Sequence, residues 1–143
     1  MNELIELIRN DECRGAVKCA DGSVHKFMHR GVKDLYRLVV ESGIEMSGGF
    51  AADRVIGRGA ALLLVKARVN CVYAFMMSAG AQEMLLSNGI EVECEKVVDY
   101  IVNRTGDGMC PVEKLTLHTD DPDEAVKLIG SFLENVSLKN NLI

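Results

Sequence analysis

Residues 103–113 (NRTGDGMCPVE) hold the side chains best suited to chemistry. Pro111 suits the first position of a helix, where a missing N–H costs nothing, and Glu113 stands where a capping-box acid belongs. Cys110 is then the N-cap residue, beside unpaired backbone N–H groups and the positive end of the helix dipole. That position favours a thiolate, which makes Cys110 a candidate nucleophile. The alternative is a well-capped helix start with an inert sulfur.

The glycine turn before this cysteine could also wrap an anion, because closely spaced backbone N–H groups form anion-binding concavities. We therefore count its polar residues, together with the capping acid, as candidate ligand-binding positions: Asn103, Arg104, Thr105, Gly106, Asp107 and Glu113.

A second group of candidates lies in residues 52–67, a stretch rich in alanine and leucine that predicts a helix with Asp53 as its N-cap. Gly57 and Gly59 each weaken such a helix by about 1 kcal/mol relative to alanine. Close approach of a sheet or a ligand would explain why glycine is used there.

Arg54 and Arg58 are four residues apart and would share one face of that helix. They form either a clamp for an anionic ligand or a pair of solvated surface arginines. Asp53 or Asp107 would supply the general acid or base if the site is catalytic.

The remaining pattern predicts an α/β fold. Asp21-Gly22 favours a hairpin between strands, and the helix that begins at Ser78, between two apolar strands, completes a βαβ pattern. The predicted strands cover residues 14–20, 23–28, 70–76 and 90–98, with a short strand or turn at 46–52. The other predicted helices cover residues 2–9, 32–41, 78–88, 111–117 and 122–135.

Composition limits the function classes. The 143 residues predict a single domain, with 48% hydrophobic and 26% charged residues. A net charge of −5 and 5% aromatic residues argue against a nucleic-acid partner. No apolar run is long enough to span a membrane, and the polar start does not resemble a signal peptide. Five scattered cysteines without a CxxC motif favour free thiols in a reducing cytoplasm.

Several common sites are missing. The chain has no GxGxxG or GxxxxGK[ST] motif, and Ser78 lacks a GxSxG context. Zinc deaminases place His or Cys ligands at two successive helix starts, but residues 51–54 and 77–81 contain neither. We therefore expect no metal and no cofactor.

Three stretches, ADRVIGRGAALLL, SAGAQEMLLSNGIEVECEKVV and YIVNRTGDGMCPVE, resemble an uncharacterised prokaryotic family, a domain of unknown function with a cytidine-deaminase-like fold that lacks the zinc site. The upstream GVKDLYRLV resembles it as well, and the string NRTG-x-G-x-CP-x-E is the most specific part. The resemblance implies a three-layer α-β-α sandwich with a mixed sheet and highlights the positions already named, without implying an activity.

Because ligands collect at the carboxyl ends of parallel strands, we expect Asp53, Arg54, Ser78 and the loop from Arg104 to Cys110 to gather at one place. Our leading hypothesis is a pocket for a small anionic metabolite, with nucleotides among the candidates and Cys110 in or beside it. The alternative is a non-catalytic ligand-sensing or structural module. A homo-oligomer with sites between subunits is a further hypothesis.

Overall fold

A hairpin followed by two strand–helix units builds a five-stranded mixed sheet in the order β2-β1-β3-β4-β5. The computed structural model describes the backbone of residues 1–141 and the side chains of residues 1–138. The strands are β1 (Gly15–Lys18), β2 (Val24–Phe27), β3 (Phe50–Ile56), β4 (Cys71–Ser78) and β5 (Glu91–Val98). Strand β1 is antiparallel to both β2 and β3, whereas β3, β4 and β5 run parallel. The predicted hairpin at Asp21-Gly22 is confirmed.

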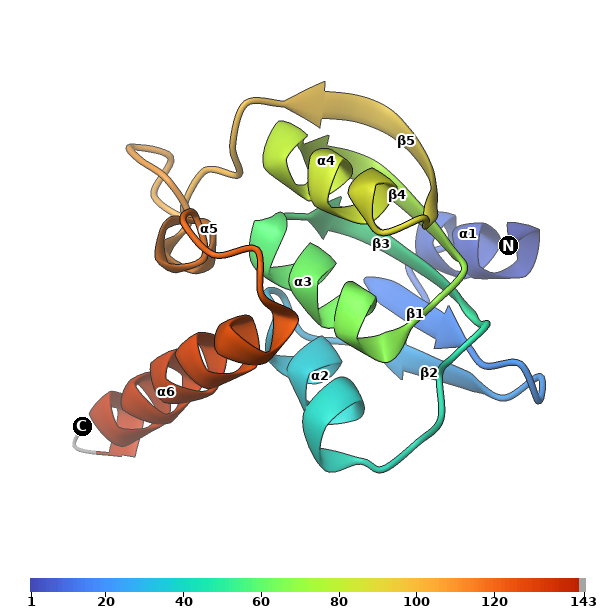
Figure 1. Cartoon of the computed structure of the whole chain (residues 1–143), viewed down its shortest axis with the longest axis horizontal. Helices are drawn as coiled ribbons and strands as arrows, with labels where there is room; N and C mark the ends of the chain where they lie inside the picture. The colour runs from blue at the N-terminus through green and yellow to red at the C-terminus, as the bar shows by residue number, and fades with distance from the viewer. Residues whose placement is uncertain (142–143) are drawn as a thin grey trace.

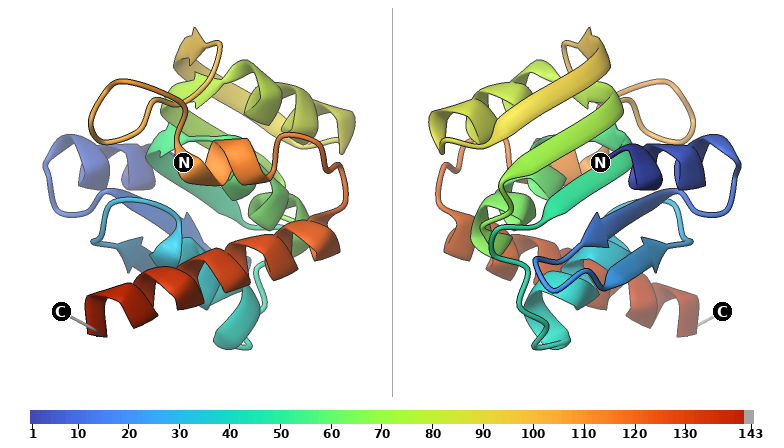
Figure 2. Two further views of the ribbon diagram at one scale, coloured as in Figure 1. Left: turned by 90° about the vertical axis from the view of Figure 1, so that its left-hand side faces the viewer. Right: turned by 90° about the vertical axis from the view of Figure 1, so that its right-hand side faces the viewer.

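Helices cover both faces of this sheet, which gives the α-β-α layering expected from the sequence (Figures 1 and 2). Helix α1 (Asn2–Arg9) packs on β1 and β3 from one side. The other face carries α2 (Lys33–Tyr36), which continues into the π-helix η1 (Arg37–Glu41), and then α3 (Arg58–Ala67), α4 (Ala79–Ser87), α5 (Pro111–Leu115) and α6 (Pro122–Asn141). Within residues 1–141, no helix is long and apolar enough to cross a membrane.

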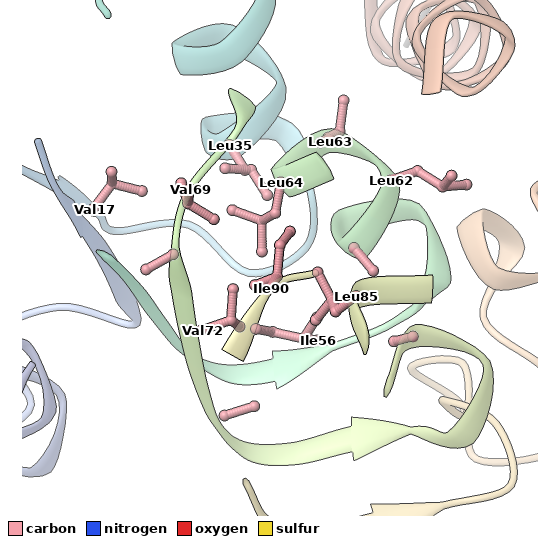
Figure 3. Close-up of a cluster of buried hydrophobic side chains, with 14 of the residues drawn as sticks. Val17, Leu35, Ile56, Leu62, Leu63, Leu64, Val69, Val72, Leu85 and Ile90 are labelled. Atoms are coloured by element: carbon pink, nitrogen blue, oxygen red, sulfur yellow. The ribbon is translucent and has the colours of Figure 1, made fainter. Parts of the chain in front are cut away.

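The main core fills the space between the sheet and α3 (Figure 3). Leu62, Leu63 and Leu64 are all buried, although consecutive helical residues point in different directions. Helix α3 is surrounded by the sheet and by α2, α4 and α6, so each of these directions is covered. Leu64 points towards Val72 of β4 and Leu85 of α4, whereas Leu62 and Leu63 point away from them (Figure 3). The continuous apolar run of residues 70–76 is therefore the central buried strand that the sequence predicts.

The helix predicted over residues 52–67 is wrong in its first part. Residues Phe50–Ile56 form β3, and α3 begins only at Arg58, with Gly57 as the N-cap. Strand β3 hydrogen-bonds to β1 on one side and β4 on the other, and this pairing outweighs the helical tendency of its alanines. Asp53 is therefore a strand residue and not a helix cap.

Two other helices differ in extent from the prediction. The helix predicted over residues 32–41 begins as the α-helix α2 at Lys33 and continues as a π-helix from Arg37 to Glu41. Helix α6 continues to Asn141, past the end expected near residue 135. In contrast, α4 starts and ends as predicted, with Ser78 as its N-cap and a hydrogen bond of 3.2 Å from the Ala81 N–H to the Ser78 hydroxyl.

Candidate functional site

The N-termini of α3 and α4 lie at the carboxyl ends of the neighbouring parallel strands β3 and β4, and both point at one buried carboxylate, Glu113. This side chain is only 5% exposed. It accepts hydrogen bonds from the Arg58 N–H at the start of α3, from the Ser78 hydroxyl at 3.0 Å and from the Ile101 N–H at 2.8 Å. The chain therefore supplies its own anion to the two helix N-termini, where a ligand anion would otherwise be stabilised.

The glycines that the sequence analysis found costly are explained by the same contact. A Cβ at Gly57 would lie 2.9 Å from Oε1 of Glu113, and a Cβ at Gly59 would lie 2.4 Å from Cγ1 of Val112. Close approach is therefore the reason for both glycines, as expected, and the partner is helix α5. No larger residue fits without moving α5 away from α3.

Arg58 also holds this region together. Its guanidinium donates to the Thr116 carbonyl at 2.9 Å and the Thr119 carbonyl at 2.6 Å, and it forms an ion pair with Asp120 at 2.5 Å. These partners fix the segment that joins α5 to α6. Arg58 lies at the start of α3 and Arg54 in β3, so the two arginines do not share a helical face as predicted.

The glycine turn folds onto itself. The Asp107 carboxylate accepts hydrogen bonds from the Asn103 amide at 2.9 Å and the Thr105 hydroxyl at 2.6 Å, and Gly106 takes a positive φ of 77°. Two of the polar groups expected to wrap an anion are thus bonded to Asp107, and hydrogen bonding holds the pKa of Asp107 below its usual range. Arg104 is exposed and points towards Gly31.

Cys110 is the N-cap residue of α5, with Pro111 at the first helical position, as predicted. Its sulfur forms no capping hydrogen bond, and α5 itself ends at Leu115. The side chain is partly buried. Glu113 does not complete a capping box, because its carboxylate reaches the starts of α3 and α4 instead.

A separate depression of about 340 Å³ opens where β1 and β3 meet, and it is lined by Asp11, Cys13, Arg14, Met28 and Arg54. Strand β1 continues to β2 on one side, whereas β3 leads to β4 and β5 on the other, so the order of the sheet reverses here. Arg54 lies towards the carboxyl end of β3, and ligands favour the carboxyl ends of parallel strands in α/β sheets. In this chain the depression brings two arginines together.

Asp53 is the neighbour of Arg54 in β3 but does not itself line this depression. In the antiparallel ladder it pairs with Gly15, and a Cβ at Gly15 would lie 2.8 Å from Cγ of Asp53. Removal of the carboxyl from water raises the pKa of Asp53 to about 7, although Arg14 and Arg54 both oppose the rise. Asp53 is therefore a group that gains and loses its proton near neutral pH.

The two arginines differ in their surroundings. Arg54 donates to the Ile8 carbonyl at 2.7 Å and forms an ion pair with the exposed Asp11, so α1 holds its guanidinium in place. Among the described residues, none forms an ion pair with Arg14. Arg14 thus keeps donors available at the depression, while Arg54 is positioned by its neighbours.

The expected single pocket is thus divided into separate places. Arg54 lines the depression and Asp53 precedes it in β3, whereas Ser78, Arg58 and Glu113 form the buried contact between α3, α4 and α5. The residues from Asn103 to Asp107 form their own turn. Among residues 1–138, no group of three or more His, Cys, Asp or Glu side chains could hold a metal ion.

Comparison with models of protein families gives a match over most of the chain. Residues 5–133 match TM1506, a domain of unknown function (DUF1893). The chain belongs to this family. The resemblance seen in the sequence is therefore confirmed, and the family description assigns no activity.

Among solved structures, the chain is similar to the crystal structure of a DUF1893 family protein from Thermotoga maritima, with 22% identity and a TM-score of 0.82 over 91% of this chain and 87% of that one. A deaminase/reductase of Thermotoga maritima that acts on diaminohydroxyphosphoribosylaminopyrimidine and 5-amino-6-(5-phosphoribosylamino)uracil, by its name, gives 12% identity and a TM-score of 0.43 over 81% of this chain and 39% of that one. The first match shows the fold, and nothing follows from the second. A search of curated proteins found no match.

The sequence analysis missed Asp11, Cys13, Arg14 and Met28 as lining residues of the depression. The available signal was the hairpin. Once residues 14–20 are read as a strand, pairing of its first residues with the end of β3 places Arg14 near Asp53. The sequence does not indicate that pairing directly, because the alanines of residues 52–67 predict a helix where β3 lies.

Proposed function

We propose that this protein binds a small anionic ligand in the depression between β1 and β3. The supporting observation is that Arg14, directly before β1, and Arg54, in β3, line one depression close to the Asp53 carboxyl. Guanidinium groups bind carboxylates and phosphates through paired hydrogen bonds, so two of them at one opening favour an anionic group. A volume of about 340 Å³ suits a small metabolite.

The buried Glu113 contact supports this location over the helix N-termini. A ligand anion at the starts of α3 and α4 would have to displace a carboxylate that already accepts three hydrogen bonds. A buried charged group that is well hydrogen-bonded is costly to displace. The depression holds no such internal anion, apart from the exposed Asp11 paired with Arg54.

Asp53 gives the proposed site a dependence on protons. With its pKa near 7, the carboxyl is protonated in a large share of molecules at neutral pH, and the neutral form leaves the positive charges of Arg14 and Arg54 free to attract an anion. When ionised, it repels the same anion. We therefore expect an anionic ligand to bind more tightly below pH 7 than above it.

Binding is tested by isothermal titration calorimetry at pH 6.5 with inorganic phosphate, ribose 5-phosphate and adenosine monophosphate as probes. Removing either guanidinium should weaken binding of a phosphate group by about 10-fold or more, since charge-assisted hydrogen bonds contribute about 1.5–3 kcal/mol. The variants are Arg14→Gln and Arg54→Gln. Thermal unfolding without ligand shows whether each variant is folded.

Arg68→Gln is the matched control, because Arg68 is exposed at the C-terminal end of α3, where the chain leads into the amino end of β4. It should leave every binding constant unchanged. Equal weakening by Arg68→Gln would point to a general effect of protein charge, and the absence of binding by all three probes would contradict the proposal.

An enzymatic form of this proposal has one observation in its favour. A carboxyl that titrates near pH 7 beside a ligand site is suited to general acid–base catalysis, and Asp53 has this property. Cys110 would be the nucleophile in the form suggested by the sequence. The alternative, a ligand-sensing module, uses the same depression without chemistry. All five cysteines are free thiols, which suits the cytoplasmic location that we propose for either form.

A further inference from the structure

A groove of about 880 Å³ lies between α6 and the pair formed by α2 and η1. None of its lining residues lines the depression. Its apolar lining includes Tyr36 of α2 and Val126, Leu133 and Val136 of α6. At Gly130 the two walls touch, because a Cβ there would lie 2.5 Å from Oη of Tyr36. Two helices packed in this way leave an apolar groove that can bind a further helix.

Helix α6 extends beyond the body of the protein. It is anchored by the fully buried Ala125 and Ile129, but the described side chains from Glu134 onward are exposed. Two of them, Val136 and Leu138, are apolar. Figures 1 and 2 show the C-terminal end of this helix projecting past its neighbours. The overhanging part therefore exposes apolar surface next to the open groove.

The charges at the groove are complementary to those of a second copy. Lys127 and Glu134 both line the groove, and a separation of seven residues places them on the same side of α6. Within residues 1–138, neither of them forms an ion pair. If two α6 helices lie antiparallel about a twofold axis near the exposed Ser131, Lys127 of each copy meets Glu134 of the other.

We propose that a second copy of this chain docks in the groove, with the two α6 helices antiparallel and α2 with η1 on the outside of a four-helix interface. Each copy then covers the exposed Val136 and Leu138 of the other, and two Lys127–Glu134 pairs set the register. This proposal is independent of the ligand site, since it uses other residues.

The outer sheet edge is a poorer place for a second copy. Glu91, Glu93 and Glu95 alternate along β5 and are exposed on the same face. Antiparallel pairing of two β5 strands would place these like charges opposite one another. The same glutamates therefore disfavour self-association through the β5 edge.

Analytical ultracentrifugation between about 5 and 200 µM is the test, and the wild-type chain should sediment as a dimer at the upper end of that range. Lys127→Glu and Glu134→Lys each turn two attractive pairs into two repulsive ones. Each should weaken dimerisation by at least about tenfold, because both symmetric pairs change together. The double variant Lys127→Glu/Glu134→Lys restores both pairs and should recover the wild-type dimer.

An equimolar mixture of the two single variants gives the sharpest outcome, since one carries Glu and the other Lys at both positions. The mixture should form heterodimers at low ionic strength. Asn135→Lys is the matched control, because Asn135 is exposed on α6 but does not line the groove. A wild-type chain that stays monomeric at every concentration, or a dimer that both single variants leave unchanged, would overturn the proposal.

Discussion

At the scale of single residues, Asp53 is the most informative position. Its carboxyl has a pKa of about 7 in the folded protein against an ordinary value of 3.8. Between these pH values the unfolded chain has lost the proton that the folded protein keeps. The free energy of unfolding should therefore fall as the pH rises from 3.8 to about 7 and then level off, as far as this group contributes.

Asp53→Asn should remove this loss, because the amide stays neutral at every pH. We expect the variant to be more stable than the wild type by about 1–3 kcal/mol at pH 8 and to differ little at pH 4. Urea unfolding at a series of pH values measures both quantities. Asp99→Asn, at an exposed position after β5, is the control. A constant difference between Asp53→Asn and the wild type from pH 4 to pH 8 would contradict the assigned ionisation.

Cys110 is the residue that the sequence singles out most strongly, and its role is a prediction that reactivity can test. Burial raises the pKa of the Cys13 and Cys71 thiols, which slows their alkylation. We expect Cys110, at the N-terminus of α5, to react with iodoacetamide faster than Cys71 or Cys94 near pH 7, as measured by mass spectrometry of the labelled peptides. If its rate is no greater than theirs, Cys110 is not an activated nucleophile.

Residue types alone identified Asp53, Arg54, Ser78 and Glu113, but their partners depend on the fold. Ser78 is the N-cap that was predicted, because the signal for a helix cap is local. Glu113 was expected to cap its own helix, whereas its carboxylate binds groups 12, 35 and 55 residues away along the chain. No local pattern predicts contacts at that separation.

At the scale of elements, the packing of α5 on α3 depends on Gly59. A methyl group there would lie 2.4 Å from Cγ1 of Val112. We expect Gly59→Ala to lower the free energy of unfolding by about 1–3 kcal/mol, because overpacking forces the two helices apart. Removing the opposing methyl groups with Val112→Ala should offset part of that loss, so the double variant should be more stable than the sum of the single changes predicts.

Gly80→Ala in α4 is the matched control for this prediction. A Cβ at Gly80 would lie 3.7 Å from the Arg58 guanidinium, which is an ordinary contact, and alanine favours a helix over glycine by about 1 kcal/mol. The control should therefore be neutral or stabilising in urea unfolding. Equal losses for Gly59→Ala and Gly80→Ala, with no recovery in the double variant, would show that α5 does not press on Gly59.

Sequence patterns predicted the elements with local signals and failed where pairing decided the outcome. The hairpin at Asp21-Gly22 and the helix after Ser78 have such signals. Residues Phe50–Ile56 contain alanines, which suit a helix, yet they form a strand because β1 and β4 lie on both sides of them. This one difference moves Asp53 and Arg54 from a helix start to the edge of the depression.

At the scale of the whole molecule, the layered α/β fold and the family follow from the sequence, but the location of the proposed ligand site does not. The depression exists because antiparallel pairing of β1 with β3 brings Arg14 next to Arg54, and because α1 holds the Arg54 guanidinium. The helix N-termini at the carboxyl ends of β3 and β4 are filled by Glu113. An anionic ligand is therefore expected at the depression and not at the starts of α3 and α4.

The most direct test is a two-dimensional ¹⁵N–¹H NMR titration of the labelled wild-type protein with inorganic phosphate at pH 6.5. We predict saturable changes in the amide signals of Cys13, Arg14 and Arg54, with the signals of Arg58, Ala81 and Ile101 unchanged. Changes confined to Arg58, Ala81 and Ile101 would mean that phosphate displaces Glu113 at the helix N-termini, and they would contradict the location proposed here.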